Sequence, residues 1–229
     1  MAGTGYVAAL PASALPAGPP GSQLVTLVIV SGAPSVTVTA APLGGTLVRA
    51  VTAGGEGARP VLALVPSPAT GGPGAGQAAT VGVSLGPAAA AGGPAGGAAL
   101  ALTVSTAVTW QLDFGGGTGQ TTVNMARGRV AGLALGMGSA SVQVTLPQPD
   151  GTVTLRLEGG ASQLAVSVPA GVPARVAAAA GASRVALGAS AWTGVGAGTV
   201  LAQPGWASAA GRLDIDATSG VSQVTVTDR

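Results

Sequence analysis

The stretch LDFGGGTGQTTVN, residues 112–124, combines two patterns that could bind a nucleotide. Asp-Phe-Gly carries a metal-binding aspartate in protein kinases, and a glycine-rich run before Thr-Thr is similar to a phosphate-binding loop. A phosphate-binding loop also needs a lysine and a following helix, but Gln120 stands in place of the lysine and a strand-like run follows. The kinase pattern needs a catalytic-loop histidine, and the chain has no histidine. The sequence therefore predicts no nucleotide site.

Carboxylates are the metal ligands that remain, because the chain contains neither cysteine nor histidine. Asp214 and Asp216 form the one close pair, in LDID, and in a strand they would share one face. They could provide half of a Ca²⁺ site, or they could be solvent-facing residues that keep a terminal strand soluble. We expect neither a metal nor a cofactor.

Catalytic groups are equally scarce. Ser-His and Cys-His nucleophile pairs cannot form. Asp113 and Asp214 hold equivalent places in LDF and LDID, but they belong to distant parts of the chain. Arg156 and Glu158 lie two residues apart, which suits a solvated ion pair as well as a catalytic one. We therefore predict that the protein is not an enzyme.

The three tryptophans, Trp110, Trp192 and Trp206, leave two alternatives open. They could form an exposed aromatic platform for a sugar or a peptide. They could instead fill the rim of the fold where its width changes, which is the interpretation that we favour.

The chain has few charges, with 7% charged residues and a net charge of +2. So thin a positive charge attracts nucleic acid weakly, and we expect no nucleic-acid partner. The best candidate for a membrane span, LVTLVIV at residues 24–30, is far shorter than the ~20 residues that a spanning helix needs. We therefore expect no membrane span within this chain.

The elements that position these residues are short strands. Residues 1–22 predict a flexible Pro/Ala-rich arm or linker, and residues 23–229 predict a single β-rich domain. Within that domain, residues 23–105 predict irregular first rungs with Gly/Pro-rich loops at 67–77 and 86–99. Residues 106–229 predict a regular repeat region.

The repeat consists of an apolar pair, a small glycine-rich corner and an alternating strand. Successive corners from Gly119 onward are 19, 22, 21 and 39 residues apart, the last being about two units. A period near 21 predicts stacked units that bury a continuous core, and therefore an all-β, β-solenoid architecture. Glycine at a corner would supply a positive φ without a steric penalty. The predicted corner glycines are Gly32, Gly119, Gly138, Gly160, Gly181 and Gly220.

Residues 155–185, LRLEGGASQLAVSVPAGVPARVAAAAGASRV, and the closing LDIDATSGVSQVTV resemble the toast-rack family. The resemblance covers residues 106–229, and the front half matches only loosely. It implies a β-solenoid-like domain of the kind found in bacterial cell-envelope and adhesin-like proteins. It implies no catalytic residue, and the membrane segments that often precede such domains are not seen in this sequence.

Together these features predict a non-enzymatic structural or interaction domain of the cell envelope. It would be extracytoplasmic or at the cell surface, and it would present a rigid, poorly charged face to a protein or cell-envelope partner. The alternative is a self-assembling scaffold or filament subunit. Such a subunit would polymerise through its strand edges or its N-terminal arm.

Overall fold

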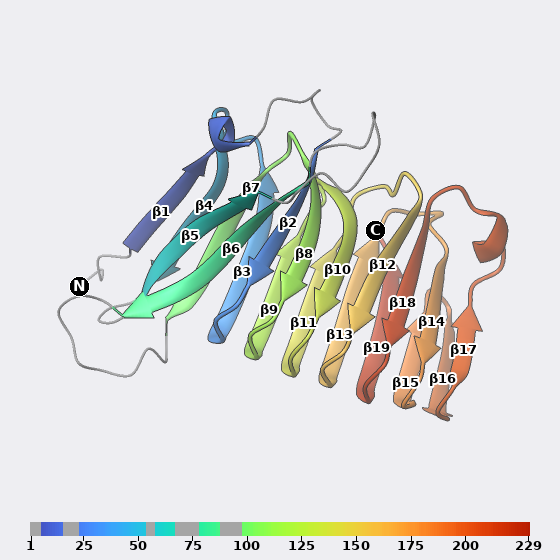
Figure 1. Cartoon of the computed structure of the whole chain (residues 1–229). Coiled ribbons are helices and arrows are strands. Elements are labelled where there is room, and N and C mark those ends of the chain that lie inside the picture. Colours follow the sequence, from blue (N-terminus) through green and yellow to red (C-terminus); the bar gives the residue numbers. More distant parts are fainter. Residues whose placement is uncertain (1–5, 16–22, 54–57, 67–77, 88–97) are drawn as a thin grey trace.

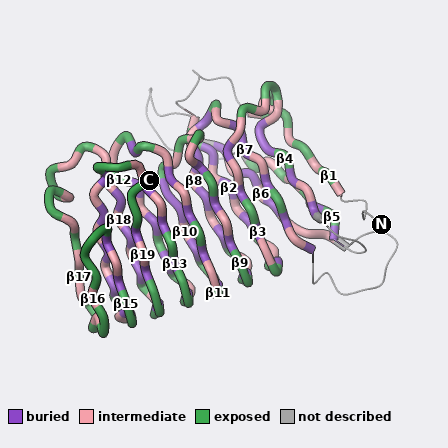
Figure 2. Tube along the Cα trace, turned by 180° about the vertical axis from the view of Figure 1, so that it is seen from behind, coloured by how far each residue is buried: buried purple, intermediate pink, exposed green. Residues whose placement is uncertain are grey.

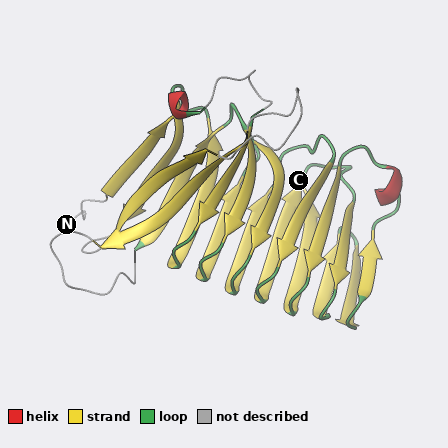
Figure 3. Cartoon of the chain, in the orientation of Figure 1, coloured by secondary structure: helices red, strands yellow, loops and turns green. Residues whose placement is uncertain are grey.

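A computed structural model of the chain describes residues 6–15, 23–53, 58–66, 78–87 and 98–229. In these residues strand follows strand, and the two helices are single 3-10 turns, η1 (Ala12–Ala14) and η2 (Trp206–Ser208) (Figure 3). The prediction of an all-β, stacked-rung fold is confirmed. The predicted loop at 67–77 lies outside the described residues, as do residues 88–97 of the predicted loop at 86–99.

The strands form two sheets that pack face to face (Figure 1). Sheet A contains, in spatial order, β1 (Tyr6–Pro11), β4 (Thr46–Ala53), β7 (Ala99–Ser105), β3 (Ala33–Ala41), β9 (Thr118–Asn124), β11 (Ser139–Thr145), β13 (Ala161–Val168), β19 (Val221–Asp228), β15 (Ala182–Leu187) and β16 (Ser190–Val195). Sheet B contains β17 (Thr199–Ala202), β14 (Ala174–Ala178), β18 (Arg212–Ala217), β12 (Thr152–Leu157), β10 (Arg129–Leu135), β8 (Thr109–Phe114), β2 (Leu24–Ile29), β6 (Ala78–Pro87) and β5 (Ala58–Pro66).

The repeating unit is a strand of sheet B, a tight corner and the next strand of sheet A. We call this unit a rung. Along the stack the rungs are β2/β3, β8/β9, β10/β11, β12/β13, β18/β19 and β14/β15. Strands β6 and β7 continue the stack beyond β2/β3 as the pair β6/β7, and most of their connection lies outside the described residues. Neighbouring rungs pair in parallel, and at the corner end of both sheets the register is unbroken. Each unit therefore places its corner directly beside the corner of the next.

The core lies between the sheets and follows from the alternation of residues along each strand. Val153, Leu155 and Leu157 of β12 point inward, and so do Leu164 and Val166 of β13. Figure 2 shows this alternation as purple patches that recur along every central strand. Each fully buried side chain of this size contributes about 1.5–3 kcal/mol. The buried residues form one cluster that extends through the stack.

The order of the rungs in space differs from their order in the chain. The last rung in the chain, β18/β19, lies between β12/β13 and β14/β15, where Figure 1 shows it in red among orange strands. At the other end, β2/β3 lies between β6/β7 and β8/β9. The predicted spacing of two units between Gly181 and Gly220 is thus wrong, because the hairpin strand β16, strand β17 and a loop fill that interval rather than a further rung.

The corner glycines form a column along one edge of the molecule. Gly117, Gly138, Gly160 and Gly220 lie one above another, and the amides of Thr118 and Ser139 donate to the carbonyl oxygens of Gly138 and Gly160 at 3.3 and 3.0 Å. Gly32 stands before β3 and Gly181 before β15, at the equivalent corners of their rungs. Gly119 lies inside β9 instead, so the corner glycine of that rung is Gly117 and not the predicted Gly119.

Most of the corner glycines have no positive φ, and neighbouring backbone crowds some glycines at this edge. Among the corner glycines only Gly181 has a positive φ, of 87°. A Cβ on Gly32 would lie 2.9 Å from the carbonyl oxygen of Gly117, and a Cβ on Gly159 would lie 2.6 Å from the amide nitrogen of Gly138. The prediction of a left-handed conformation is therefore wrong for the corner glycines other than Gly181. Backbone crowding explains Gly32 and the adjacent Gly159, whereas a Cβ on Gly117 or Gly138 would make ordinary contacts and one on Gly220 would meet open space.

Antiparallel strands close both ends of the stack. The edge strands β1 and β16 of sheet A and β5 and β17 of sheet B each run antiparallel to their neighbour. The prediction of a flexible arm over residues 1–22 is wrong for residues 6–15, because β1 pairs with β4 and η1 follows. The alternating burial of Tyr6–Pro11 and the guanidinium of Arg59, 4.5 Å from the Tyr6 ring centre, hold this strand in place.

Candidate functional site

The outer face of sheet A carries an uncharged polar surface that we call the ladder face. It comprises the outward residues of five adjacent strands, β3, β9, β11, β13 and β19. Their registers align these residues into three rows across the strands. The rows are Ser35, Gln120, Ser141, Gln163 and Gln223; Thr37, Thr122, Gln143, Ala165 and Thr225; and Thr39, Asn124, Thr145, Ser167 and Thr227.

Hydroxyl and amide groups dominate the ladder face, and each of its side chains is exposed or half-exposed. The strands are about 4.8 Å apart and outward residues of one strand are about 6.6 Å apart, so the face is a regular two-dimensional array. Contacts within the array are weak, such as the 3.4 Å hydrogen bond between the Ser167 and Thr227 hydroxyls. Its donors and acceptors are therefore available to a partner that matches the array.

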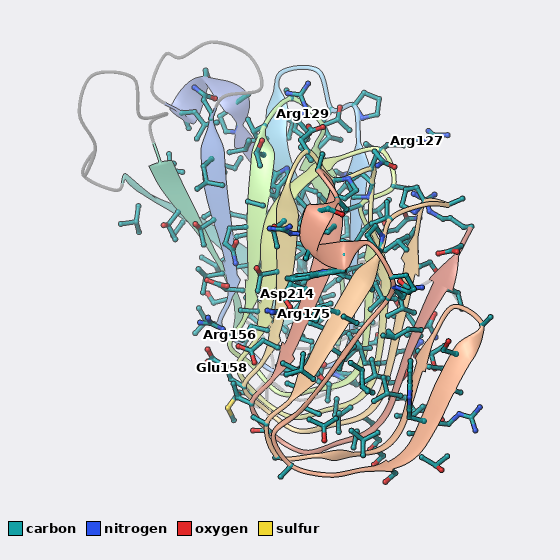
Figure 4. All side chains as sticks on the ribbon, turned by 90° about the vertical axis from the view of Figure 1, so that its right-hand side faces the viewer. Arg127, Arg129, Arg156, Glu158, Arg175 and Asp214 are labelled. Carbon is teal, nitrogen blue, oxygen red and sulfur yellow. The ribbon has the colours of Figure 1, made fainter. Side chains whose placement is uncertain are left out.

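The outer face of sheet B is different, because it carries a charged band near one end of the stack. The band consists of Asp113, Arg156, Glu158, Arg175, Asp214 and Asp216. Figure 4 shows Arg156, Glu158, Arg175 and Asp214 on one side of the molecule, away from Arg127 and Arg129. Asp113 shares a cross-strand row with Ala134, Arg156 and Asp216, so two strands separate the two aspartates.

Arg175 and Asp214 form the strongest polar contact of the charged band. The Nε and Nη2 groups of Arg175 donate to the two carboxylate oxygens of Asp214 at 2.8 and 2.6 Å. The Asp214 side chain is only 15% exposed, so the pair is partly shielded from water. Donating these bonds raises the pKa of the Arg175 guanidinium above its ordinary value, although burial opposes the shift. The two-point geometry orients both side chains.

Trp206 completes this cluster. The guanidinium carbons of Arg175 and Arg212 lie 4.2 and 4.8 Å from the centre of the Trp206 ring. The indole N–H donates to the carbonyl oxygen of Leu213 at 2.7 Å. Trp206 thus fixes the loop at 203–211 against sheet B through cation–π contacts and a hydrogen bond.

Arg156 makes looser contacts than Arg175. Its Nη1 lies 3.8 Å from Oε1 of Glu158, and its Nε lies 3.8 Å from Oδ2 of Asp216. The Arg156 side chain is 53% exposed. Asp214 and Asp216 lie on the same outward side of β18, but each faces a different arginine. In the described part of the chain, no three metal-ligating side chains gather. The geometry of the two aspartates is that of ion-pair partners on one strand.

A shallow hollow of about 360 Å³ lies on sheet B beside the charged band. It is lined by Ala134 of β10 and Gly136 just after it, by Asp113 of β8, and by Arg156 of β12 with Glu158 just after that strand. The hollow exists because the outward side chains of β10 are small, whereas those of its neighbours β8 and β12 are long. It is open to solvent and lined by charges of both signs.

The three tryptophans occupy different environments. Trp110 is fully buried in the core, and its indole N–H donates to the carbonyl oxygen of Ser105 at 2.7 Å. Trp192 lies half-buried on edge strand β16, opposite Val185 of β15. Trp206 lies under two guanidinium groups. The structure therefore does not bring the three rings together.

Sequence reasoning missed two features of these surfaces. The ladder face had a visible signal, since polar Ser, Thr, Gln and Asn residues alternate with valine in SVTVT, TTVN, SVQVT and QVTVT. The Arg175–Asp214 pair had none, because its residues are 39 positions apart and meet only when β18 lies beside β14.

Comparison with known proteins adds one structural relative. The sequence matches no protein-family model, and it has no significant match among curated proteins. The crystal structure of a proposed cell adhesion protein from Clostridium sporogenes is similar, with a TM-score of 0.67 over 99% of each chain and 10% sequence identity. The shared fold thus extends over the whole stack and beyond the repeat region at 106–229. None of the helices in the described ranges has the length and hydropathy of a membrane span.

Proposed function

We propose that this chain is a non-enzymatic interaction domain of the cell envelope and that it binds its partner through the ladder face. The observation that carries the proposal is the uncharged three-row array over five adjacent rungs. The rigid sheet holds the hydroxyl and amide groups at fixed spacing, so little conformational entropy is lost on binding. A protein or a surface polymer of the envelope with matching donors and acceptors fits such a face.

An extracytoplasmic location and the toast-rack resemblance belong to the same proposal. The low charge and the Thr- and Ser-rich strands are common in surface proteins, and the fold is shared with a proposed cell adhesion protein. An epitope tag on the full-length protein tests the location. Antibody should label the tag on intact cells, whereas labelling only after lysis would contradict it.

Binding to isolated bacterial cell-envelope material tests the ladder face. We expect Gln143→Arg, in the centre of the ladder face, to lower the retained fraction about tenfold, because it places an unpaired charge at the contact. Thr154→Arg is the matched control, since Thr154 is a central outward residue of sheet B on β12. Equal retention of both variants, or a loss in the control alone, would exclude the ladder face.

Salt dependence gives a second readout of the same proposal. An uncharged face binds through hydrogen bonds and packing, so retention should change less than about twofold between low and high salt. A steep fall with salt would instead assign binding to the charged band of sheet B.

A self-assembling scaffold is the second candidate function. Edge strands β16 and β17 at one end of the stack carry no charged side chain, and charges on edge strands normally block pairing with another copy. The route through the N-terminal residues is less favoured, because β1 pairs with β4 of its own chain. Light scattering and negative-stain microscopy test assembly, and a lysine at Thr193 on β16 should abolish it. Monodisperse monomer at high concentration would exclude this candidate.

A further inference from the structure

The position of β18/β19 in the stack has a consequence for association between copies. This rung, which we call the inserted rung, occupies a slot whose walls are β12/β13 on one side and β14/β15 on the other. Both walls precede the inserted rung in the chain and are joined to each other by residues 169–173. The slot is therefore made entirely by residues 152–187, and a loop at 203–211 delivers the rung to it.

The slot recognises the inserted rung through the same register on both sides. Val224 lies between Leu164 of β13 and Val185 of β15, and Val226 lies between Val166 and Leu187. In sheet B, Ile215 lies between Leu155 of β12 and Val176 of β14. These side chains are all buried. A rung that enters the slot thus gains two parallel hydrogen-bonded ladders and a row of core contacts.

The delivering loop is longer than its path requires. From β17 to β18 the chain crosses one strand, β14, which is about 10 Å at the usual strand spacing. The nine residues at 203–211 could extend over about 30 Å. Their excess length is folded into η2 and held by Trp206, through Leu213, Arg175 and Arg212. We call these contacts of Trp206 the latch.

We propose that the inserted rung exchanges between two copies of the chain, each placing its residues 212–229 in the slot of the other. The partner is a second copy because the slot matches the buried Ile and Val residues of this rung in a defined register. Every contact within the slot is the same in the exchanged form, so the difference lies in the loop and the latch. Reciprocal exchange gives a closed dimer, and one-way exchange gives a chain of copies.

This association differs from edge-to-edge assembly and does not depend on the ladder face as a binding surface. Edge addition would leave β19 beside β13 of its own chain. Exchange places β19 of one copy beside β13 of the other. The two are therefore separated by asking which copy contributes each strand.

Single-cysteine variants answer this question directly, because the full chain contains no cysteine. Gln163 and Gln223 are exposed and face each other across β13 and β19. Gln163→Cys and Gln223→Cys proteins are mixed, unfolded together in urea and refolded at high concentration. A short bis-maleimide linker is then added and products are separated under denaturing conditions. We expect a covalent heterodimer that exceeds the homodimers formed by either variant alone.

Gln120→Cys mixed with Ser141→Cys is the matched control, since these residues face each other across β9 and β11, which do not exchange. Cross-linking of this pair at the same yield would show non-specific association and overturn the proposal. So would a yield from the Gln163 and Gln223 pair that does not exceed the homodimer background.

The latch provides a second test of the exchange. Adding Trp206→Ala to both cysteine variants should raise the heterodimer yield several-fold, because the loop is released in each copy. Trp192→Ala, on β16 and outside the loop, should leave the yield unchanged. An equal increase from both tryptophan variants would mean that general destabilisation, and not the latch, controls association, and would overturn its assigned role.

Discussion

The outer faces of the two sheets share one backbone architecture but carry different chemistry. On sheet A, three outward rows run across five rungs without a charged side chain. On sheet B, the outward rows collect four acidic residues and three arginines within four strands and the adjoining corner. The pairing of the strands fixes where each outward side chain lies, but it does not fix the residue type. The inward residues stabilise the stack whichever polar residues point outward.

The two faces also differ in what covers them. The loop at 203–211 lies against sheet B, where Trp206 contacts Arg175 and Arg212. This loop therefore covers part of the charged band. Arg175, which pairs with Asp214, also helps to fix the loop through Trp206. The ladder face has no such internal role, since its side chains are exposed or half-exposed and make few contacts with one another.

The largest effect is expected where the two faces join. Gly159→Ala places a methyl group against the carbonyl oxygen of Met137, 2.6 Å away, at the corner between β12 and β13. Because backbone on both sides must shift, we expect a loss of about 3 kcal/mol in the free energy of unfolding, measured in urea. Gly151→Ala is the control, because nothing lies within 4 Å of its added Cβ. Equal losses would contradict the close-approach explanation.

Within the charged band, the two arginines should behave differently. Arg175→Ala leaves the shielded Asp214 carboxylate without its two donors and uncovers the Trp206 ring, so we expect a loss of about 2 kcal/mol. Arg156→Ala removes only 3.8 Å contacts of an exposed side chain and should cost about 0.5 kcal/mol or less. Denaturant midpoints of the two variants check this order, and its reversal would contradict the assigned roles.

Charged residues introduced on the ladder face should attract or repel one another across neighbouring strands, as the charged residues of sheet B do. Thr122 and Gln143 are directly opposite on β9 and β11. The double change Thr122→Glu with Gln143→Glu should destabilise the fold by about 1 kcal/mol relative to Thr122→Glu with Gln143→Arg. Chemical unfolding at low and high salt measures the difference, which should shrink as salt screens the charges. A difference that survives high salt would point to packing instead.

The smallest effect is expected at Glu158. Its carboxylate lies 3.8 Å from Arg156 and its side chain is 54% exposed. Glu158→Gln keeps the shape and removes the charge, so thermal unfolding should shift by no more than about 0.5 kcal/mol in stability. A loss above about 1 kcal/mol would show that the charged band acts as one coupled network.

Much of the fold could be predicted from local patterns. The alternation of small aliphatic and polar residues in stretches such as TVTLRL and SASVQVT specifies strands with one buried face, and recurring glycine-rich corners specify a stack. Tyr6–Pro11 was misjudged, because a short run of Ala and Pro in a strand differs little from a linker until a partner strand, β4, is known.

The order of the rungs was decided by tertiary structure alone. The segments GASQLAV, GASRVAL and GVSQVTV are nearly interchangeable, so each could stack on any other with the same hydrogen bonds and the same buried residues. Local sequence therefore determines that a rung forms, and it leaves open which rungs are neighbours. Loop lengths, capped ends and the contacts of Trp206 and Arg175 select the order in which Asp214 meets an arginine 39 residues away. Pairing between strands is a long-range choice among near-equal alternatives, and only the complete stack resolves it.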